Sequence, residues 1–178
     1  MANQIQDDLV SEFVDSATKV GATVAVVDRT AEKLHLALLE TTKEEELILF
    51  AYPDHLEVEL FQPFLKDGRV IVTPTIEQLS SVSTGVTDAF CAVASTGSVC
   101  VPISRNLSSP VSLLTRKHIA VVDADTIVKR PRDIFLNNEL ARNNRSFSFI
   151  TGPSATADMG PLVIGVHGPG QLHIIVLV

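Results

Sequence analysis

Glycine, proline and hydroxyl residues gather in one stretch near the end of the chain, residues 150–170 (ITGPSATADMGPLVIGVHGPG). Glycine lets the backbone approach a ligand closely, and hydroxyl and backbone N–H groups can hydrogen-bond an anion. The stretch therefore predicts a carboxylate or phosphate site lined by Gly152, Ser154, Thr156 and Gly168. The alternative is a tight turn in which the hydroxyl groups cap their own backbone.

Two further residues of this stretch are the candidates for acid–base chemistry. His167 stands between glycines in a rigid loop, where an imidazole could transfer a proton or contact a ligand. The alternative is an imidazole that hydrogen-bonds the loop backbone. Asp158 could act as a general base or orient a histidine, and the alternative is a carboxylate that caps a short helix. A nucleophile at Ser154 is disfavoured, because the GxSxG turn of serine hydrolases is absent.

One such turn would bind an anion weakly. Three hydrogen bonds to a charged ligand contribute ~1.5–3 kcal/mol each, while association costs at least ~4 kcal/mol. The resulting affinity is about millimolar or weaker. A second element is needed, and the glycine–hydroxyl turn Thr96, Gly97 and Ser98 is the candidate.

The elements that must position these residues alternate between helical and strand periodicity. Helices are expected over residues 5–17, 31–40, 56–65, 87–94 and 131–140, and strands over 22–27, 47–51, 69–73, 98–103, 119–122, 146–151 and 172–178. A Ser/Thr-rich loop is expected over 74–84, Asp54 as a helix N-cap, and Gly97 as the C-cap of the helix over 87–94.

This alternation predicts one α/β domain over residues 1–178. Short apolar runs between helices are typical of an open, mainly parallel sheet with helices on both faces. In such sheets ligands bind outside the carboxyl ends of the strands, where Gly152 and Ser154 would follow a strand. Neither the Rossmann GxGxxG nor the P-loop pattern is present.

Charge and cysteine content exclude several classes of protein. The net charge of -7 argues against a nucleic-acid or membrane-surface binder, which would need a basic face. No secretory signal or membrane-spanning run is recognisable, so a cytoplasmic location is expected. Cys91 and Cys100 are then reduced and buried, and two cysteines cannot supply the four thiolates of an iron–sulfur cluster. No metal site and no bound cofactor are predicted.

Three segments together carry a resemblance to a known family: GVTDAFCAVASTGSVCV, HIAVVDADTIV and ITGPSATADMGPLVIGVHGPGQLHIIVLV. They resemble the LUD domain of lactate-utilisation protein C. The resemblance implies a fold like that of sugar-phosphate isomerases and CoA transferases. It also implies a role in the oxidation of L-lactate to pyruvate, beside partner proteins that carry iron–sulfur clusters. Ser98 replaces the family's threonine, and Gly160 stands where the family has glutamate, which favours anion binding over acid–base catalysis.

Three hypotheses of function follow from these observations. The first is a component of an L-lactate dehydrogenase complex other than the redox-active chain, which leaves open whether the chain is itself an enzyme. The second is a stand-alone enzyme or binder for a phosphorylated or CoA-like ligand. The third is an interaction module with a degenerate site. A homo-oligomer is compatible with all three.

Overall fold

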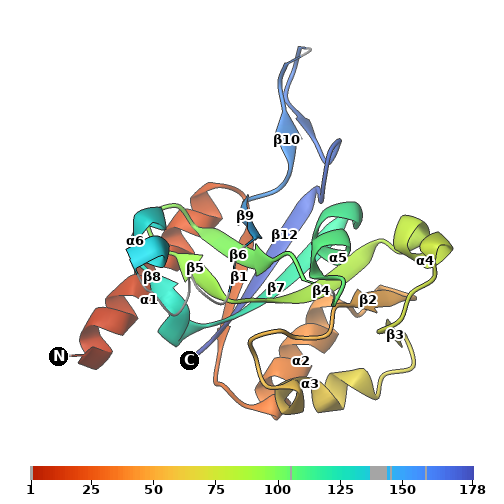
Figure 1. Cartoon of the computed structure of the whole chain (residues 1–178), viewed down its shortest axis with the longest axis horizontal. Helices are drawn as coiled ribbons and strands as arrows, with labels where there is room; N and C mark the ends of the chain where they lie inside the picture. The colour runs from red at the N-terminus through yellow and green to blue at the C-terminus, as the bar shows by residue number, and fades with distance from the viewer. Residues whose placement is uncertain (1, 105, 137–143, 145, 159) are drawn as a thin grey trace.

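The computed structural model describes residues 2–104, 106–136, 144, 146–158 and 160–178 (Figure 1). The elements in chain order are α1 (Ala2–Lys19), β1 (Thr23–Val27), α2 (Ala31–Thr41), β2 (Ile48–Phe50), α3 (Val58–Leu65), β3 (Val70–Ile71), α4 (Ile76–Ser81), β4 (Thr84–Ala89), β5 (Cys91–Val93), β6 (Ser98–Pro102), α5 (Ser108–Leu114), β7 (Lys117–Asp123), the 3-10 turn η1 (Ala124–Thr126), β8 (Ile127–Val128), α6 (Pro131–Leu136), β9 (Phe147–Thr151), β10 (Ala155–Thr156), β11 (Val163–Ile164) and β12 (Gln171–Leu177). The end of the expected helix over 131–140 lies outside the described residues.

A six-stranded parallel sheet forms the centre of the fold, in the order β1-β12-β7-β4-β2-β3. The last strand, β12, lies between β1 and β7, so that Ile174 pairs with Val24 on one side and with Ala120 on the other. This confirms the predicted α/β class and the mainly parallel sheet. Burial of β12 on both faces from Ile174 to Leu177 explains why this part of the strand is a continuous apolar run.

The two faces of the sheet are covered by different elements. On one face, α2 and α3 pack their buried side chains Leu38 and Phe64 over Ile119 and Ile175. On the other face, α1 and a second sheet cover the alternate strand residues, Ala120 and Ile174 among them. Alternation along β7 and β12 therefore sends odd-numbered side chains toward α2 and even-numbered ones toward α1.

The second sheet, in the order β8-β5-β6-β9, corrects the expected helix over residues 87–94. That segment is the end of β4 followed by β5, and its side chains are buried throughout. A run of small residues that is buried on every side shows no period, so the pattern does not distinguish a helix from a strand. Gly97 consequently closes the β5–β6 hairpin rather than capping a helix.

Two other local predictions are corrected. The segment 74–84 contains α4, whose Thr75 and Gln78 form a reciprocal capping box. Asp54 does not cap α3, which begins after Glu57. Its backbone N–H, with those of the next two residues, instead donates to Oδ2 of the buried Asp88. Burial raises the pKa of Asp88, and the hydrogen bonds from the backbone of His55 and Leu56 oppose that rise.

The strand β9 does not belong to the central sheet. It pairs antiparallel with β6, and the chain then forms a short antiparallel ribbon of β10 and β11 before it enters β12. We call the described residues of 155–166 the arm, and Figure 1 shows β10 rising away from the body of the molecule. Asp158 lies in the turn of the arm and not at the start of a helix.

Substitution of Gly97 tests the packing of the β5–β6 turn. Gly97 has a φ of 65°, and an added Cβ would lie 2.2 Å from the backbone nitrogen of Ala17 in α1. Gly97→Ala should therefore lower the free energy of unfolding by about 2–4 kcal/mol in urea titrations. Gly68→Ala is the matched control, because nothing lies within 4 Å of its added Cβ. Equal stability of the two variants would contradict this account.

Candidate functional site

A cavity of about 460 Å³ lies at the base of the arm. We call it the arm pocket, and it lies at the amino ends of β7 and β12. Its lining residues are Ser112, Leu113, His118, Phe149, Ile150, Thr151, Gly152, Pro153, Ser154, Ala155, His167, Gly168, Pro169 and Leu172. The expectation of a site at the carboxyl ends of the central strands is thus wrong for this stretch, because the strand that precedes Gly152 belongs to the second sheet.

The two turns of the 150–170 stretch meet at this pocket. The backbone N–H of Ser154 donates to the carbonyl of Pro169 at 2.8 Å, and the N–H of Gly165 donates to the carbonyl of Ser154 at 2.8 Å. An added Cβ on Gly168 would lie 3.2 Å from the Ser154 Cβ. The backbone N–H of Ser154 is therefore used within the fold, and its hydroxyl is the group that a ligand can reach.

The glycine at position 152 is required by packing. Its φ is 66°, and an added Cβ would lie 2.2 Å from the carbonyl oxygen of Val20, just after α1. Gly152 therefore lines the pocket because the chain must pass closely over α1 there, a requirement independent of any ligand.

The second predicted turn lies outside the pocket lining. Gly97 packs on α1, while the hydroxyls of Thr96 and Ser98 lie 2.7 Å apart. The Ser98 hydroxyl is in turn 2.7 Å from that of Thr151, which does line the pocket. The turn is thus connected to the pocket lining through Ser98, which contacts Thr151 by its hydroxyl and also pairs with it in the ladder of β6 and β9.

The remaining candidates lie on the arm or directly after it. Thr156 pairs with Val163 in the ribbon, and neither it nor the exposed Asp158 lines the pocket. His167 lines the pocket and is exposed, so the structure does not bring the two catalytic candidates together there. Gly160 also lies on the arm, in open space, so the glutamate missing at that position leaves the pocket lining unchanged.

His118 is the pocket residue that the sequence analysis missed. Its side chain is fully buried, its Nε2 lies 2.9 Å from the hydroxyl of Thr87, and its Nδ1 has no partner among the described residues. Burial lowers the pKa of His118 to about 3, so the imidazole is neutral at neutral pH. Its position at the start of an apolar strand was the available signal, because it shares a face with Ala120 and Val122.

Among the described residues that line the arm pocket, the two histidines are the only ones with an ionisable side chain. Although the chain has a net charge of -7, this described lining presents hydroxyl and imidazole groups and no carboxylate. A small anion would therefore meet hydrogen-bond donors and no direct repulsion from the wall.

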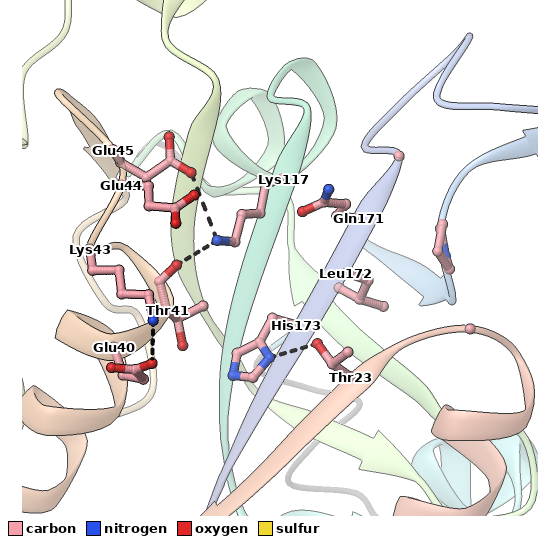
Figure 2. Close-up of a pocket in the computed structure, with 13 residues that line it drawn as sticks. Thr23, Glu40, Thr41, Lys43, Glu44, Glu45, Lys117, Gln171, Leu172 and His173 are labelled. Carbon is pink, nitrogen blue, oxygen red and sulfur yellow. Dashed lines mark hydrogen bonds and ion pairs between the residues drawn. The ribbon is translucent and has the colours of Figure 1, made fainter.

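A second cavity, of about 530 Å³, lies on the opposite face of the same sheet edge (Figure 2). Pro153 and Leu172 line both cavities. His173 faces this second cavity, with its Nδ1 2.7 Å from the Thr23 hydroxyl and its Nε2 without a described partner. Burial, and then the nearby ammonium group of Lys117, lower the pKa of His173.

The charges of the second cavity are largely balanced within it. Lys117 donates to the carbonyl of Thr41 and lies 3.7 Å from Glu45, while Lys43 lies 2.7 Å from Glu40 (Figure 2). Both lysines are therefore paired with glutamates of the same wall. This arrangement offers an anion less than the arm pocket does, and the arm pocket is the better candidate.

Metal ligands, thiols and apolar helices define what other sites the described residues could form. Within the described ranges, no three His, Cys, Asp or Glu side chains are grouped so that they could hold a metal ion. Cys91 and Cys100 are buried free thiols that face each other across β5 and β6, as predicted. None of the helices in the described part of the chain is both long and apolar enough to span a bilayer.

The LUD domain pattern matches residues 10–177, nearly the whole chain. The chain belongs to the LUD domain family. This LUD domain is 32% identical over 186 residues to lactate utilization protein C of Bacillus subtilis (strain 168), covering 92% of this chain and 75% of that protein. It is 28% identical over 183 residues to lactate utilization protein C of Halalkalibacterium halodurans, covering 95% of this chain and 79% of that one.

Another relative matches over a shorter part of the LUD domain. Lactate utilization protein C of Shouchella clausii is 36% identical over 100 residues, which are 53% of this chain but only 44% of that protein. Among solved structures, a DUF162 family protein from Deinococcus radiodurans superposes with a TM-score of 0.73 at 22% identity, covering 97% of this chain and 98% of that one. The superposition confirms the fold.

Because His118 is buried in the LUD domain, we expect the stability of the protein to depend on pH. Because the pKa of His118 is lowered on folding, its contribution is fully present above its unfolded value of about 6.5 and is lost as the pH falls toward the folded value. Between about pH 6.5 and 4.5, the free energy of unfolding of the wild type should fall by about 2–3 kcal/mol more than that of His118→Leu. Urea titrations across this range measure the difference.

His167→Leu is the matched control for this experiment, because it removes an exposed histidine of the same pocket. Its stability should follow the pH dependence of the wild type. A His118→Leu variant with the same pH slope as the wild type would show that His118 is protonated as easily in the folded as in the unfolded chain.

Proposed function

We propose that this LUD domain protein is a component of an L-lactate oxidation system and binds a small carboxylate, lactate or pyruvate, in the arm pocket. In this proposal it acts beside partner proteins that carry iron–sulfur clusters. Membership of the LUD family and relatives named lactate utilization protein C support the pathway. The ligand class is supported by the lining of the pocket.

The observation that carries the ligand proposal is the unpartnered Nδ1 of the buried His118 at the wall of the pocket. A buried polar atom without a partner is costly, and a ligand that completes its hydrogen bonding recovers that cost. When Nε2 accepts a hydrogen bond from the Thr87 hydroxyl, Nδ1 carries the ring hydrogen and can donate a hydrogen bond to a carboxylate oxygen that comes into contact with it.

Two hydroxyl groups of the pocket lining would add to the hydrogen-bond donors around the carboxylate. Ser154 and Thr151 both line the pocket, and each can donate to the carboxylate while His167 covers its open side. Hydrogen bonds of this kind to a charged ligand contribute about 1.5–3 kcal/mol each, against an association cost of at least ~4 kcal/mol. The expected affinity is therefore about millimolar.

The pocket favours a carboxylate over a phosphate group. A phosphate carries more charge and is held in most sites by lysine, arginine or several free backbone N–H groups. Lysine and arginine are missing from the described lining, and the N–H of Ser154 already donates to Pro169. The stand-alone binder of a phosphorylated ligand is therefore the weaker hypothesis.

In this proposal the partner proteins, and not this chain, carry out the oxidation of L-lactate. Conversion of lactate to pyruvate releases two electrons and two protons, and the electrons would pass to the clusters of the partner proteins. This chain has two cysteines, fewer than the four thiolates that a cluster uses. Its own part would be to hold the carboxylate.

Removal of one hydroxyl should weaken binding of the carboxylate. We expect L-lactate and pyruvate to shift amide NMR signals around the arm pocket with millimolar affinity, and Ser154→Ala to weaken this binding about tenfold or more. Ser80→Ala is the control, because Ser80 is an exposed serine on α4 whose hydroxyl bonds only within its helix. Absence of binding by either acid, or unchanged affinity in Ser154→Ala, would refute the ligand proposal.

The pathway proposal is tested in the source organism. Deletion of the gene should abolish growth on L-lactate and leave growth on pyruvate intact, and the tagged protein should copurify with cluster-bearing partners. Restoration of growth by wild type but not by Ser154→Ala would connect the pocket to the pathway. Normal growth of the deletion strain on L-lactate would rule out the assigned role.

A further inference from the structure

The arm carries a run of large apolar side chains that are open to solvent. Leu162, Val163, Ile164 and Val166 are 66%, 48%, 58% and 52% exposed. The antiparallel ribbon of the arm is held by two ladder pairs, Ala155 with Ile164 and Thr156 with Val163. So short an antiparallel ribbon gains little stability by itself, and an exposed apolar run of this size marks an interaction surface.

An apolar hollow lies beside this projection. Leu113 and Phe149 line the arm pocket and are themselves 40% and 43% exposed, and the neighbouring Leu114 is 62% exposed. Ala155, the first residue of the arm, and His167, directly after its last residue, line the same pocket. The projection and the hollow are therefore adjacent on one side of the molecule.

A surface that holds both a projection and a hollow can pair with itself. In a two-fold dimer the same patch of each copy faces the other, so that each projection can enter the hollow of its partner. The seven apolar side chains together expose on the order of 700 Å², close to the roughly 800 Å² that each partner contributes to a standard interface.

The charge of the chain also favours a second copy as the partner of this patch. The chain has 21 acidic and 14 basic residues, so most surfaces of two copies would repel one another. The seven apolar side chains of the arm and the hollow carry no charge, and Asp158 is the one acidic residue among the described residues of the arm. Repulsion between two copies is therefore weaker at this patch than at the more acidic parts of the surface.

We propose that two copies of this chain pair through their arms, each arm lying across the arm pocket of the other copy and closing it. The pocket is then completed by the second copy. Closure removes water from the pocket, which strengthens hydrogen bonds from His118 and Ser154 to a bound anion. The pairing goes beyond the proposed carboxylate function and does not depend on it.

Sedimentation of the full chain without ligand tests the pairing. The mass measured by sedimentation should be twice the 19.2 kDa of one chain for the wild type and that of a single chain for Leu162→Asp. The circular dichroism spectrum of Leu162→Asp should match that of the wild type. Ile76→Asp is the matched control, because it places the same charge at an 88% exposed isoleucine on α4, and it should remain a dimer. A monomeric wild type, or a dimeric Leu162→Asp, would overturn the proposal.

Cross-linking tests the geometry of the pair. Each engineered chain carries one new thiol, either Ile164→Cys on the arm or Leu113→Cys in the hollow, while both native cysteines are buried. Mild oxidation by copper phenanthroline should join the two variants into a covalent dimer when they are mixed, and Ile76→Cys mixed with either should give none.

Two results would contradict the pairing. If Leu113→Cys forms disulfides with Ile76→Cys as readily as with Ile164→Cys, the cross-links come from random collision and not from a defined pair. An arm whose amides are protected from hydrogen exchange only when iron–sulfur partner proteins are added would show that a different protein covers it. Because the ligand is absent throughout, failure of the carboxylate proposal would leave these results unaffected.

Discussion

Parallel pairing of β12 with both β1 and β7 is the constraint on which the rest of the fold depends. The strand β12 lies inside the sheet between two strands that precede it in the sequence, so the sheet is continuous only when β12 has joined both of them. Alternation along the strands then sends His118 and Leu172 to one face and Lys117 and His173 to the other. The two cavities at this sheet edge are the result of that alternation.

The stretch between β9 and β12 connects two sheets. β9 ends in the second sheet, and β12 begins in the central one. The chain must turn over the end of α1, where Gly152 passes against the Val20 carbonyl, project into the arm, and return. The dense glycines and prolines of residues 150–170 therefore serve a change of sheet as well as the shaping of a pocket, and the two requirements are met by the same turns.

Burial decides the electrostatics of the pocket. His118 is held neutral by desolvation, and its bond to Thr87 satisfies only one ring nitrogen. An exposed histidine such as His167 can exchange its hydrogen bonds with water, while a buried one depends on what enters the pocket. The pocket thus combines a buried, uncharged imidazole inside with exposed polar groups such as His167 at its mouth.

The sequence by itself determined the α/β class, the parallel sheet, most helices and strands, and the meeting of the turns at Gly152 and Gly168, because periodicity and turn residues are local signals. Only the tertiary structure decided that residues 87–94 are strands, that β9 lies in a second sheet, and that Thr96 is remote from the pocket while His118 lines it. The physical reason is that strand pairing and burial depend on contacts between distant segments, and a buried strand or histidine has no local pattern that reveals its neighbours.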